Sequence, residues 1–158
     1  PIATFGALLH MLVHSLTKSS IFFTVGHASQ MHDTQEMSRI KGLVRGNPLV
    51  GWGLLFGVMA IVGMPPFGVF TSEFLILTAT MKDAPYLTPF LLLGLGVAFA
   101  AIFRRVQPMV SGHRPPHQHL IKVAHIPVVL HMVIVLVIGL YMPNFLSQWF
   151  HMAVELLK

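Results

Sequence analysis

The sequence has no cysteine and very little charge. Only 9% of its 158 residues are charged and five are acidic, whereas a soluble domain carries about 25% charged residues. Without cysteine there are no disulfides, no thiolate metal site and no cysteine-bound iron–sulfur cluster. We therefore expect neither an ordinary water-soluble domain nor a chain with a redox centre of its own.

Long apolar runs take the place of the missing charge. Hydrophobic residues make up 54% of the chain, and they fall into blocks of about twenty, the length that crosses roughly 30 Å of hydrocarbon. The blocks are residues 3–28, 48–81, 86–103 and 126–142. This pattern predicts an all-α membrane protein with about four transmembrane helices. Because the sequence starts at Pro1 without an initiator methionine or a basic leader, we expect the sequence to be a C-terminal portion of a longer chain.

The second block is too long for one straight crossing. It has 34 residues, and Gly63, Pro65, Pro66 and Gly68 interrupt it. Proline removes a helical hydrogen bond and clashes with the preceding turn. We therefore predict one span made of two half-helices, broken at Gly63–Gly68.

The C-terminal residues 144–158 carry apolar side chains at helical spacing, with polar residues between them. Such a pattern is typical of an amphipathic helix that lies on a membrane surface. A tail docked on a partner protein explains the pattern equally well. The apolar positions are Phe145, Trp149, Phe150, Val154 and Leu157.

Lysine and arginine are distributed unevenly between the connections. Seven lie in residues 29–47 and 104–122, and two lie on the other side of the spans: Arg39, Lys41, Arg45, Arg104, Arg105, Arg114 and Lys122 against Lys82 and Lys158. The positive-inside rule then makes both of these loops cytoplasmic. We expect a multi-pass protein of a bacterial or archaeal inner membrane, with the lipid bilayer and not nucleic acid as its surroundings.

His10, His14 and Lys18 are ionisable residues inside the first span. Four-residue steps on an α-helix drift only about 40° each, so the three share one stripe. Lys18 is too far from either end of the span to reach water, because ten residues of helix measure roughly 15 Å. An intramembrane lysine costs about 2.5–3.5 kcal/mol on the insertion scale, which favours a functional role.

Glu73 is the second intramembrane charge, just after the predicted break. One interpretation is a carboxylate that only caps the second half-helix, where the helix dipole favours negative charge. The other is a group that exchanges protons, since low polarity disfavours the charged forms of acids and amines alike. The two roles are compatible.

The remaining histidines are weaker candidates. His131 lies alone in the fourth span, so we treat it as an accessory site at most and expect a hydrogen bond to a neighbouring helix. His113, His117 and His119 lie among prolines in a loop, which does not favour a defined metal site. We expect no metal and no cofactor in this chain.

Two stretches resemble one family. They are HMLVHSLTK from His10 to Lys18 and GMPPFGVFTSE from Gly63 to Glu73. Both are similar to the antiporter-like membrane subunits shared by respiratory complex I, Mrp-type antiporters and membrane-bound hydrogenases. In detail, the sequence of these stretches is most similar to the hydrogenase-4 component F type.

The resemblance implies a fold and a function. The family has two inverted five-helix repeats, each with a broken helix, and this sequence would hold the end of the second repeat. Its members translocate protons within a hydrogenase or an NADH:quinone-type oxidoreductase. The partners would be other membrane subunits and the rest of the same subunit. A Mrp-type Na+/H+ antiporter and a scaffold without transport remain alternatives.

The resemblance also assigns roles to residues. His10, His14 and Lys18 correspond to the family's central proton relay. Glu73 corresponds to the acidic or basic residue of the second broken helix, where protons are thought to leave. The family varies between Lys and Glu at that position, and Glu73 agrees with the acidic variety.

Overall fold

The computed structural model describes residues 2–113 and 125–157. These residues form helices and connections with no strand, so the predicted all-α fold is confirmed. The helices are α1 Ile2–His32, α2 Leu43–Gly46, α3 Pro48–Ile61, α4 Gly68–Asp83, the short 3-10 helix η1 Pro85–Leu87, α5 Thr88–Ser111, α6 His125–Leu140 and α7 Asn144–Leu156.

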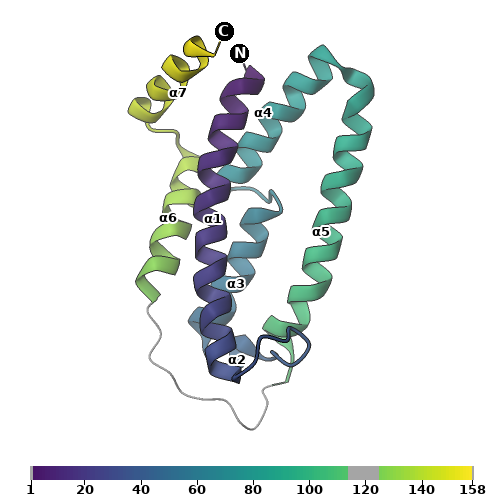
Figure 1. Ribbon diagram of the computed structural model, residues 1–158, viewed down its shortest axis with the longest axis vertical. Helices are drawn as coiled ribbons and strands as arrows, with labels where there is room; N and C mark the ends of the chain where they lie inside the picture. Colours follow the sequence, from purple (N-terminus) through teal and green to yellow (C-terminus); the bar gives the residue numbers. More distant parts are fainter. Residues whose placement is uncertain (1, 114–124, 158) are drawn as a thin grey trace.

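Helix α1 is the centre of the bundle and packs against α3, α4 and α6 (Figure 1). Its buried residues recur every three or four positions, so they form one face. They are Gly6, Leu9, Val13, Thr17, Ser20, Thr24, Ala28 and Met31. Thr17 and Thr24 donate hydrogen bonds to carbonyls of their own helix, at 2.7 and 2.8 Å. Ser20 donates to the carbonyl of Val128 in α6 at 3.2 Å, so these buried hydroxyls are all paired.

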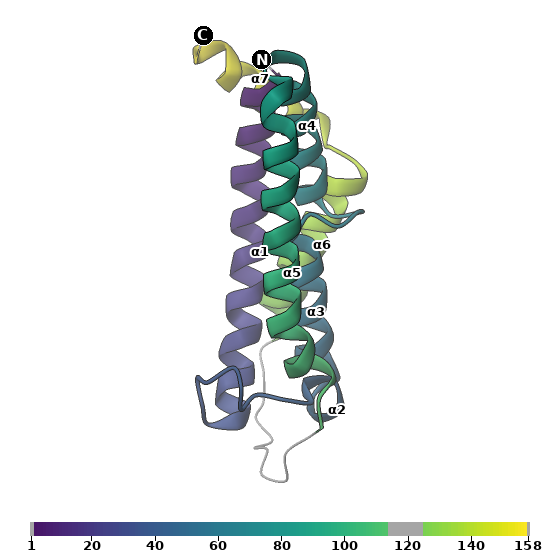
Figure 2. The ribbon, with the colours of Figure 1, turned by 90° about the vertical axis from the view of Figure 1, so that its right-hand side faces the viewer.

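Helices α3 and α4 are the two half-helices predicted for residues 48–81, and their crossing the membrane as one span stays a prediction. They follow one another along α1, and their connection lies near the middle of its length (Figure 2). Residues 62–67 between them are not helical, and Gly63 adopts a positive φ of 71°. The predicted break at Gly63–Gly68 is therefore confirmed.

Helix α6 lies against this break at backbone distance. A Cβ atom added to Gly139 would overlap the carbonyl oxygen of Pro66 and come within 2.6 Å of the amide nitrogen of Gly68. Thr71 donates a hydrogen bond to the carbonyl of Gly139 at 3.5 Å. Only glycine at this position allows α6 to approach the break so closely.

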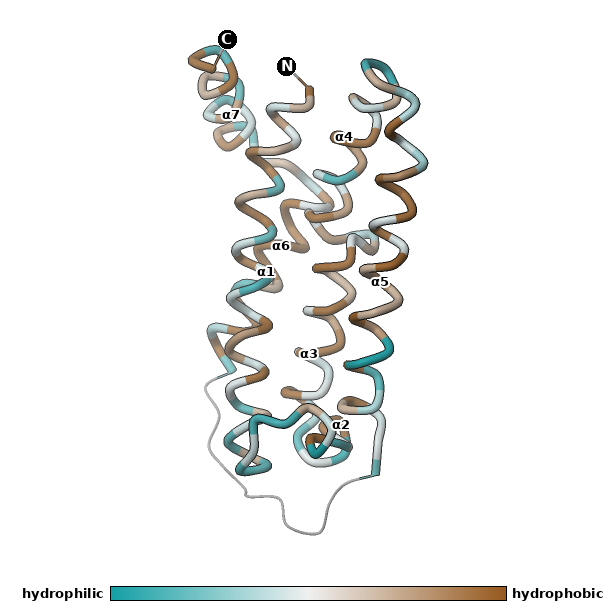
Figure 3. Tube along the Cα trace, turned by 45° about the vertical axis from the view of Figure 1, so that its right-hand side comes forward, coloured by the Kyte–Doolittle hydropathy of each residue, from teal (hydrophilic) through white to brown (hydrophobic). Residues whose placement is uncertain are grey.

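The two basic connections share one end of the bundle. Lys41 and Gly42 lie against Gly112, and α2 packs against α5. Figure 3 shows hydrophilic residues gathered at this end, around α2. Arg114 and Lys122 lie outside the described residues, as does Lys158. The cytoplasmic orientation of this end stays a prediction.

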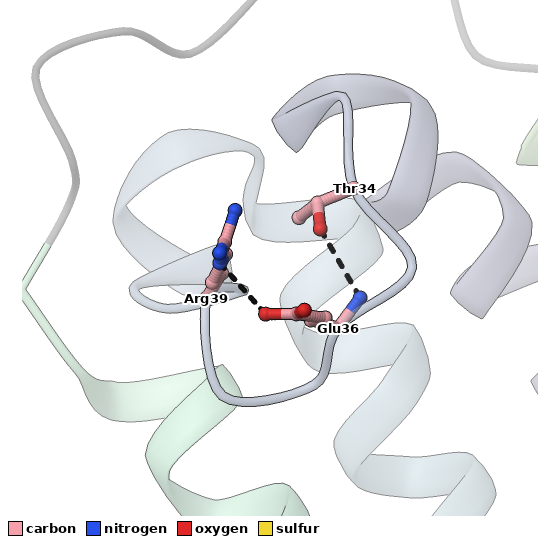
Figure 4. Close-up of polar contacts among 3 residues, drawn as sticks. All are labelled: Thr34, Glu36 and Arg39. Carbon is pink, nitrogen blue, oxygen red and sulfur yellow. Dashed lines mark hydrogen bonds and ion pairs between the residues drawn. The ribbon is translucent and has the colours of Figure 1, made fainter.

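The first connection is ordered by local polar contacts (Figure 4). The amide of Glu36 donates to the Thr34 hydroxyl oxygen at 3.1 Å, and the Arg39 Nε atom lies 2.7 Å from the Glu36 carboxylate. Because both charged side chains are exposed, their ion pair contributes only about 0–1 kcal/mol. The contacts shape the loop more than they stabilise the fold.

Helix α5 is longer than the sequence indicated. It continues through Arg104 and Arg105 to Ser111 and ends where Gly112 takes an extended conformation. The prediction that the third connection begins at residue 104 is therefore wrong for residues 104–111. Arginine is a good helix former, so a pair of arginines near a membrane face marks the end of the apolar span and not of the helix.

Length and composition alone identify few membrane-crossing helices in this structure. Among the described residues, the continuous segment Pro85–Ser111 alone is long and apolar enough to cross. The pair of α6 and α7, bent by 77°, qualifies only if the two are taken as one span. The half-helices α3 and α4 are short, and α1 carries its polar stripe. Neither the α3–α4 segment nor α1 therefore contains one helix that is both long enough and apolar enough to cross by these two criteria.

The C-terminal helix α7 is amphipathic, as predicted. Leu146 and Phe150 pack toward the α1 end of the core, where the rings of Phe5 and Phe150 meet edge to face at 5.6 Å. The opposite side exposes the apolar side chains of Phe145, Trp149, Met152 and Leu156. One face of α7 is thus docked on its own chain, while a membrane contact of the other face remains a prediction.

The close approach at Gly139 can be tested by adding a single methyl group. Overpacking a tight site costs about 1–3 kcal/mol, so we expect Gly139→Ala to lower the free energy of unfolding by that amount. The measurement is denaturant titration of the purified protein in detergent, followed by circular dichroism. Gly96→Ala in α5 is the control, because a Cβ there meets nothing within 4 Å. It should be neutral or stabilise the helix. Equal effects of the two substitutions would contradict this account of the break.

Candidate functional site

The predicted polar stripe lies along the edge of the packed face of α1. His10, His14 and Lys18 each follow a buried residue by one position, so they sit about 100° from the core face. His10 and His14 are half-buried, and their rings stack with centroids 5.1 Å apart at 24°. Lys18 is exposed on the surface of the described residues. The structure therefore brings the two histidines together and leaves Lys18 on the same side of the helix.

A contact between α1 and α4 extends this stripe. The Nδ1 atom of His10 lies 3.0 Å from the hydroxyl oxygen of Ser72, which is fully buried. The Ser72 hydroxyl donates to the carbonyl of Val69 at 2.7 Å. The sequence prediction did not include Ser72 among the site residues. The available signal was a hydroxyl directly before Glu73, near the start of the half-helix.

Glu73 lies against the break itself. A Cβ atom added to Gly63 would overlap the Glu73 carboxylate, so this carboxylate lies directly against the Gly63 backbone. Glu73 is half-buried and lines an open cavity of about 330 Å³ between the break, α4 and α5. Leu92, Leu95 and Gly96 of α5 form its far wall.

The capping interpretation of Glu73 is wrong. Helix α4 begins at Gly68, its N-cap residue is Phe67, and no side chain accepts a hydrogen bond there. Glu73 is thus beyond the first turn, where the exposed N–H groups of a helix end. The carboxylate lies instead against the backbone of the break at Gly63.

Three consecutive residues at the start of α4 face three different neighbours. Thr71 bonds to α6, Ser72 meets His10 of α1, and Glu73 faces the break and the cavity beside α5. Consecutive residues of a helix are about 100° apart, so this divergence follows from helical geometry. Ser72 is therefore the link between the α1 stripe and the chain segment that carries Glu73.

His131 is bonded within its own helix. Its Nδ1 atom donates to the carbonyl oxygen of Pro127 at 2.6 Å, and its ring lies 6.0 Å from that of Phe23 in α1. The expected hydrogen bond to a neighbouring helix is therefore wrong. The contact with α1 is between rings.

No group of three or more acidic or histidine side chains is placed to hold a metal in the part of the chain that the structure describes. His117 and His119 lie outside that part. His27 and His125 approach each other across α1 and α6, with ring centroids 6.4 Å apart. A pair of this kind supplies two ligands, fewer than the four that a structural zinc site uses.

Comparison with known proteins identifies the class to which this arrangement belongs. Residues 2–102 match the family described as "NADH:quinone oxidoreductase/Mrp antiporter, TM". The match includes the polar stripe, the break and Glu73. The chain belongs to this family of antiporter-like transmembrane subunits, and the resemblance inferred from the two motifs is confirmed.

Three relatives show which members of the family the chain is similar to. The chain is 40% identical to a hydrogenase-4 component F homolog of Methylacidiphilum infernorum over 157 residues, which is 99% of this chain and 33% of the relative. It is 28% identical over 113 residues to NADH-quinone oxidoreductase subunit M of Pseudomonas aeruginosa, covering 72% of this chain and 21% of the relative. It is 23% identical over 96 residues to a Na(+)/H(+) antiporter protein of Alkalihalophilus pseudofirmus, covering 61% and 20%. The chain thus spans about a third or less of these relatives.

The contact between Gly63 and Glu73 predicts an energetic coupling. In Gly63→Ala the positive φ costs roughly 1–2 kcal/mol, and the added methyl group also displaces the Glu73 carboxylate. In a Glu73→Ala background only the first cost remains. We therefore expect the double-mutant cycle, measured by denaturant unfolding in detergent, to give a coupling energy of about 0.5–3 kcal/mol.

Gly42→Ala is the matched control for this cycle. Gly42 has a similar positive φ of 66° but lies in the first connection, beside α2. Its substitution should carry the same backbone strain and be additive with Glu73→Ala. Additivity at Gly63 as well would show that the carboxylate does not press on the break.

Proposed function

We propose that this chain translocates protons across the membrane, as part of an antiporter-like subunit of a hydrogenase or NADH:quinone-type oxidoreductase complex. Family membership supports the general class of the subunit. The 40% identity to a hydrogenase-4 component F homolog over nearly the whole chain favours the hydrogenase branch. The redox chemistry then belongs to other subunits, since this chain has no cysteine for a cluster.

The observation that carries the proposal is the contact between His10 and Ser72. It fixes how α1 packs against the first turns of α4, so that the ionisable stripe and Glu73 lie on adjoining helices; the contact positions these groups and does not itself carry a proton. Non-helical backbone at membrane depth is tolerated where it is buried in protein or lines a cavity. Here the break and Glu73 border an open cavity. Ionisable groups, a helix break and a space for water therefore occur together.

In this proposal each residue has a distinct role. Lys18 is the switchable carrier, because an exposed amine on the stripe accepts a proton from groups beyond this chain. His10 and His14 are relays, since a neutral imidazole both donates and accepts. Glu73 is the terminal exchange site beside the cavity, and His131 is at most an accessory. A charge arriving at one of these groups disfavours a like charge on the next, which moves the proton along.

The setting of the chain is also part of the proposal. Its partners are other membrane subunits of the complex and the remaining part of the same subunit, which supplies the rest of a proton path. We place it in a bacterial or archaeal inner membrane as a multi-pass protein. The end that carries both basic connections, residues 29–47 and 104–122, faces the cytoplasm under the positive-inside rule.

A Mrp-type Na+/H+ antiporter is the second candidate. The similarity to the Na(+)/H(+) antiporter protein of Alkalihalophilus pseudofirmus supports it, although that similarity is lower and covers less of the chain. Affinity purification of the tagged protein from its native membrane separates the two. Hydrogenase large and small subunits in the purified complex would favour the first candidate, and other Mrp subunits the second.

Lys18 provides a direct test of transport. Removing the carrier should slow proton translocation by about a hundredfold, the scale of a lost acid–base group. We expect this for Lys18→Ala in the complete complex, reconstituted into proteoliposomes with a pH-sensitive dye. Lys82→Ala, an exposed lysine in the last turn of α4, should pump at the parent rate. Parent-level pumping by Lys18→Ala would disprove the carrier role.

Glu73 distinguishes proton exchange from support of the break. An amide can accept a hydrogen bond but cannot release a proton near neutral pH. Glu73→Gln should therefore keep the shape of the site and the assembled complex while lowering translocation by about a hundredfold. Glu36→Gln, an exposed residue of the first connection, is the control. Both assembly and pumping are measured in one preparation. Normal assembly with undiminished pumping would leave Glu73 with only a structural contact to Gly63.

A further inference from the structure

The proton count at Ser72 determines the state of His10. A serine hydroxyl has one hydrogen to donate. In this structure it points to the carbonyl of Val69, an acceptor only, at 2.7 Å. The oxygen of Ser72 must therefore accept in its contact with His10, and the donor is the Nδ1–H group of the imidazole at 3.0 Å.

A neutral imidazole carries a single N–H. With the hydrogen on Nδ1, the Nε2 atom of His10 is a bare acceptor. We propose that Ser72 is a positioning residue that holds neutral His10 in the Nδ1–H tautomer, so that Nε2 becomes the one atom through which His10 takes up and releases a proton. This inference rests on the proposed relay for its functional meaning.

The same contacts exclude a path through Ser72. A proton passed from Nδ1 to the serine oxygen would require the hydroxyl hydrogen to move on to Val69, and a backbone carbonyl does not relay it further. When His10 becomes charged, its Nδ1–H bond to Ser72 remains and the added proton sits on Nε2. His10 thus takes up and releases its proton at Nε2 alone and does not pass a proton between α1 and α4.

The burial of Ser72 fixes the direction of its hydroxyl hydrogen bond. Ser72 of α4 is fully buried and contacts a histidine of α1. Two serines of α1 near the stripe, Ser15 and Ser19, instead donate to carbonyls of their own helix. A buried partner that is already bonded on its other side cannot rotate its hydrogen toward His10 without leaving the Val69 contact. Among the described residues, no comparable bond to another helix holds the ring of His14, which stacks on His10.

The test is nitrogen-15 NMR of the complete subunit with labelled histidine, where the His10 signals are assigned by their loss in His10→Gln. The expected result for the parent is a protonated Nδ1 and an unprotonated Nε2 in neutral His10. Ser72→Ala should shift the tautomer ratio by roughly fivefold toward Nε2–H, the amount that one neutral hydrogen bond supports. Ser72→Thr keeps the hydroxyl and should retain the parent tautomer. Ser19→Ala is the matched control and should change nothing.

An Nε2–H tautomer in the parent would overturn the proposal, and this measurement needs no variant of Ser72 to fold. A parent Nδ1–H tautomer that persists in Ser72→Ala would also overturn it, because Ser72 would not be its cause.

Transport in proteoliposomes tests the exchange atom: Ser72→Ala should pump about tenfold more slowly and Ser72→Thr at the parent rate. Unchanged pumping in Ser72→Ala despite an altered tautomer would refute the role of Nε2. A locked tautomer in a complex that pumps no protons would refute the proposed function and leave the role of Ser72 standing.

Discussion

The non-helical break between α3 and α4 is the constraint on which the rest of the structure depends. Backbone N–H and C=O groups that leave a helix within a membrane must be shielded by protein or by water in a cavity. Here Gly139 of α6 covers the Pro66 carbonyl and the Gly68 amide, while Glu73 lies against Gly63. The Glu73 carboxylate, for which we propose proton exchange, is therefore also in contact with the interrupted backbone. Two glycines make the arrangement possible, one through its positive φ and one through the absence of a side chain.

Polar groups on α1 divide into two kinds according to where they sit. The hydroxyls of Thr17, Ser20 and Thr24 are buried in the packed face, and each is paired with a carbonyl. The ionisable His10, His14 and Lys18 lie along the edge of that face, increasingly exposed toward Lys18. A charge is far more costly to bury than a paired hydroxyl. Placing the ionisable groups at the edge keeps them within reach of polar partners while the core of the bundle stays tightly packed.

The sequence predicted most of the architecture, because span length, proline and intramembrane charge are local signals. The break, the stripe from His10 to Lys18 and the amphipathic tail all follow from spacing and residue type. Contacts between distant residues do not. His10 and Ser72 are 62 positions apart, and their pairing depends on how α1 and α4 rotate against each other. The true start of α4 at Gly68 decides that Glu73 is not a cap, and the bond of His131 to Pro127 depends on a rotamer. Neither could be read from hydropathy.

Helix α5 has a consequence for how the protein enters the membrane. The residues in its middle are exposed, one side of them toward the open cavity beside Glu73. The helix is held to the bundle mainly near its two ends, by η1 and α4 at one and by α2 and α3 at the other. A helix this apolar partitions into lipid without neighbours. Helix α1, in contrast, carries two histidines and a lysine, which are costly at membrane depth, and it packs against α3, α4 and α6. Hydropathy therefore allows α5 to enter the bilayer independently of its neighbours, although it is synthesised after α1.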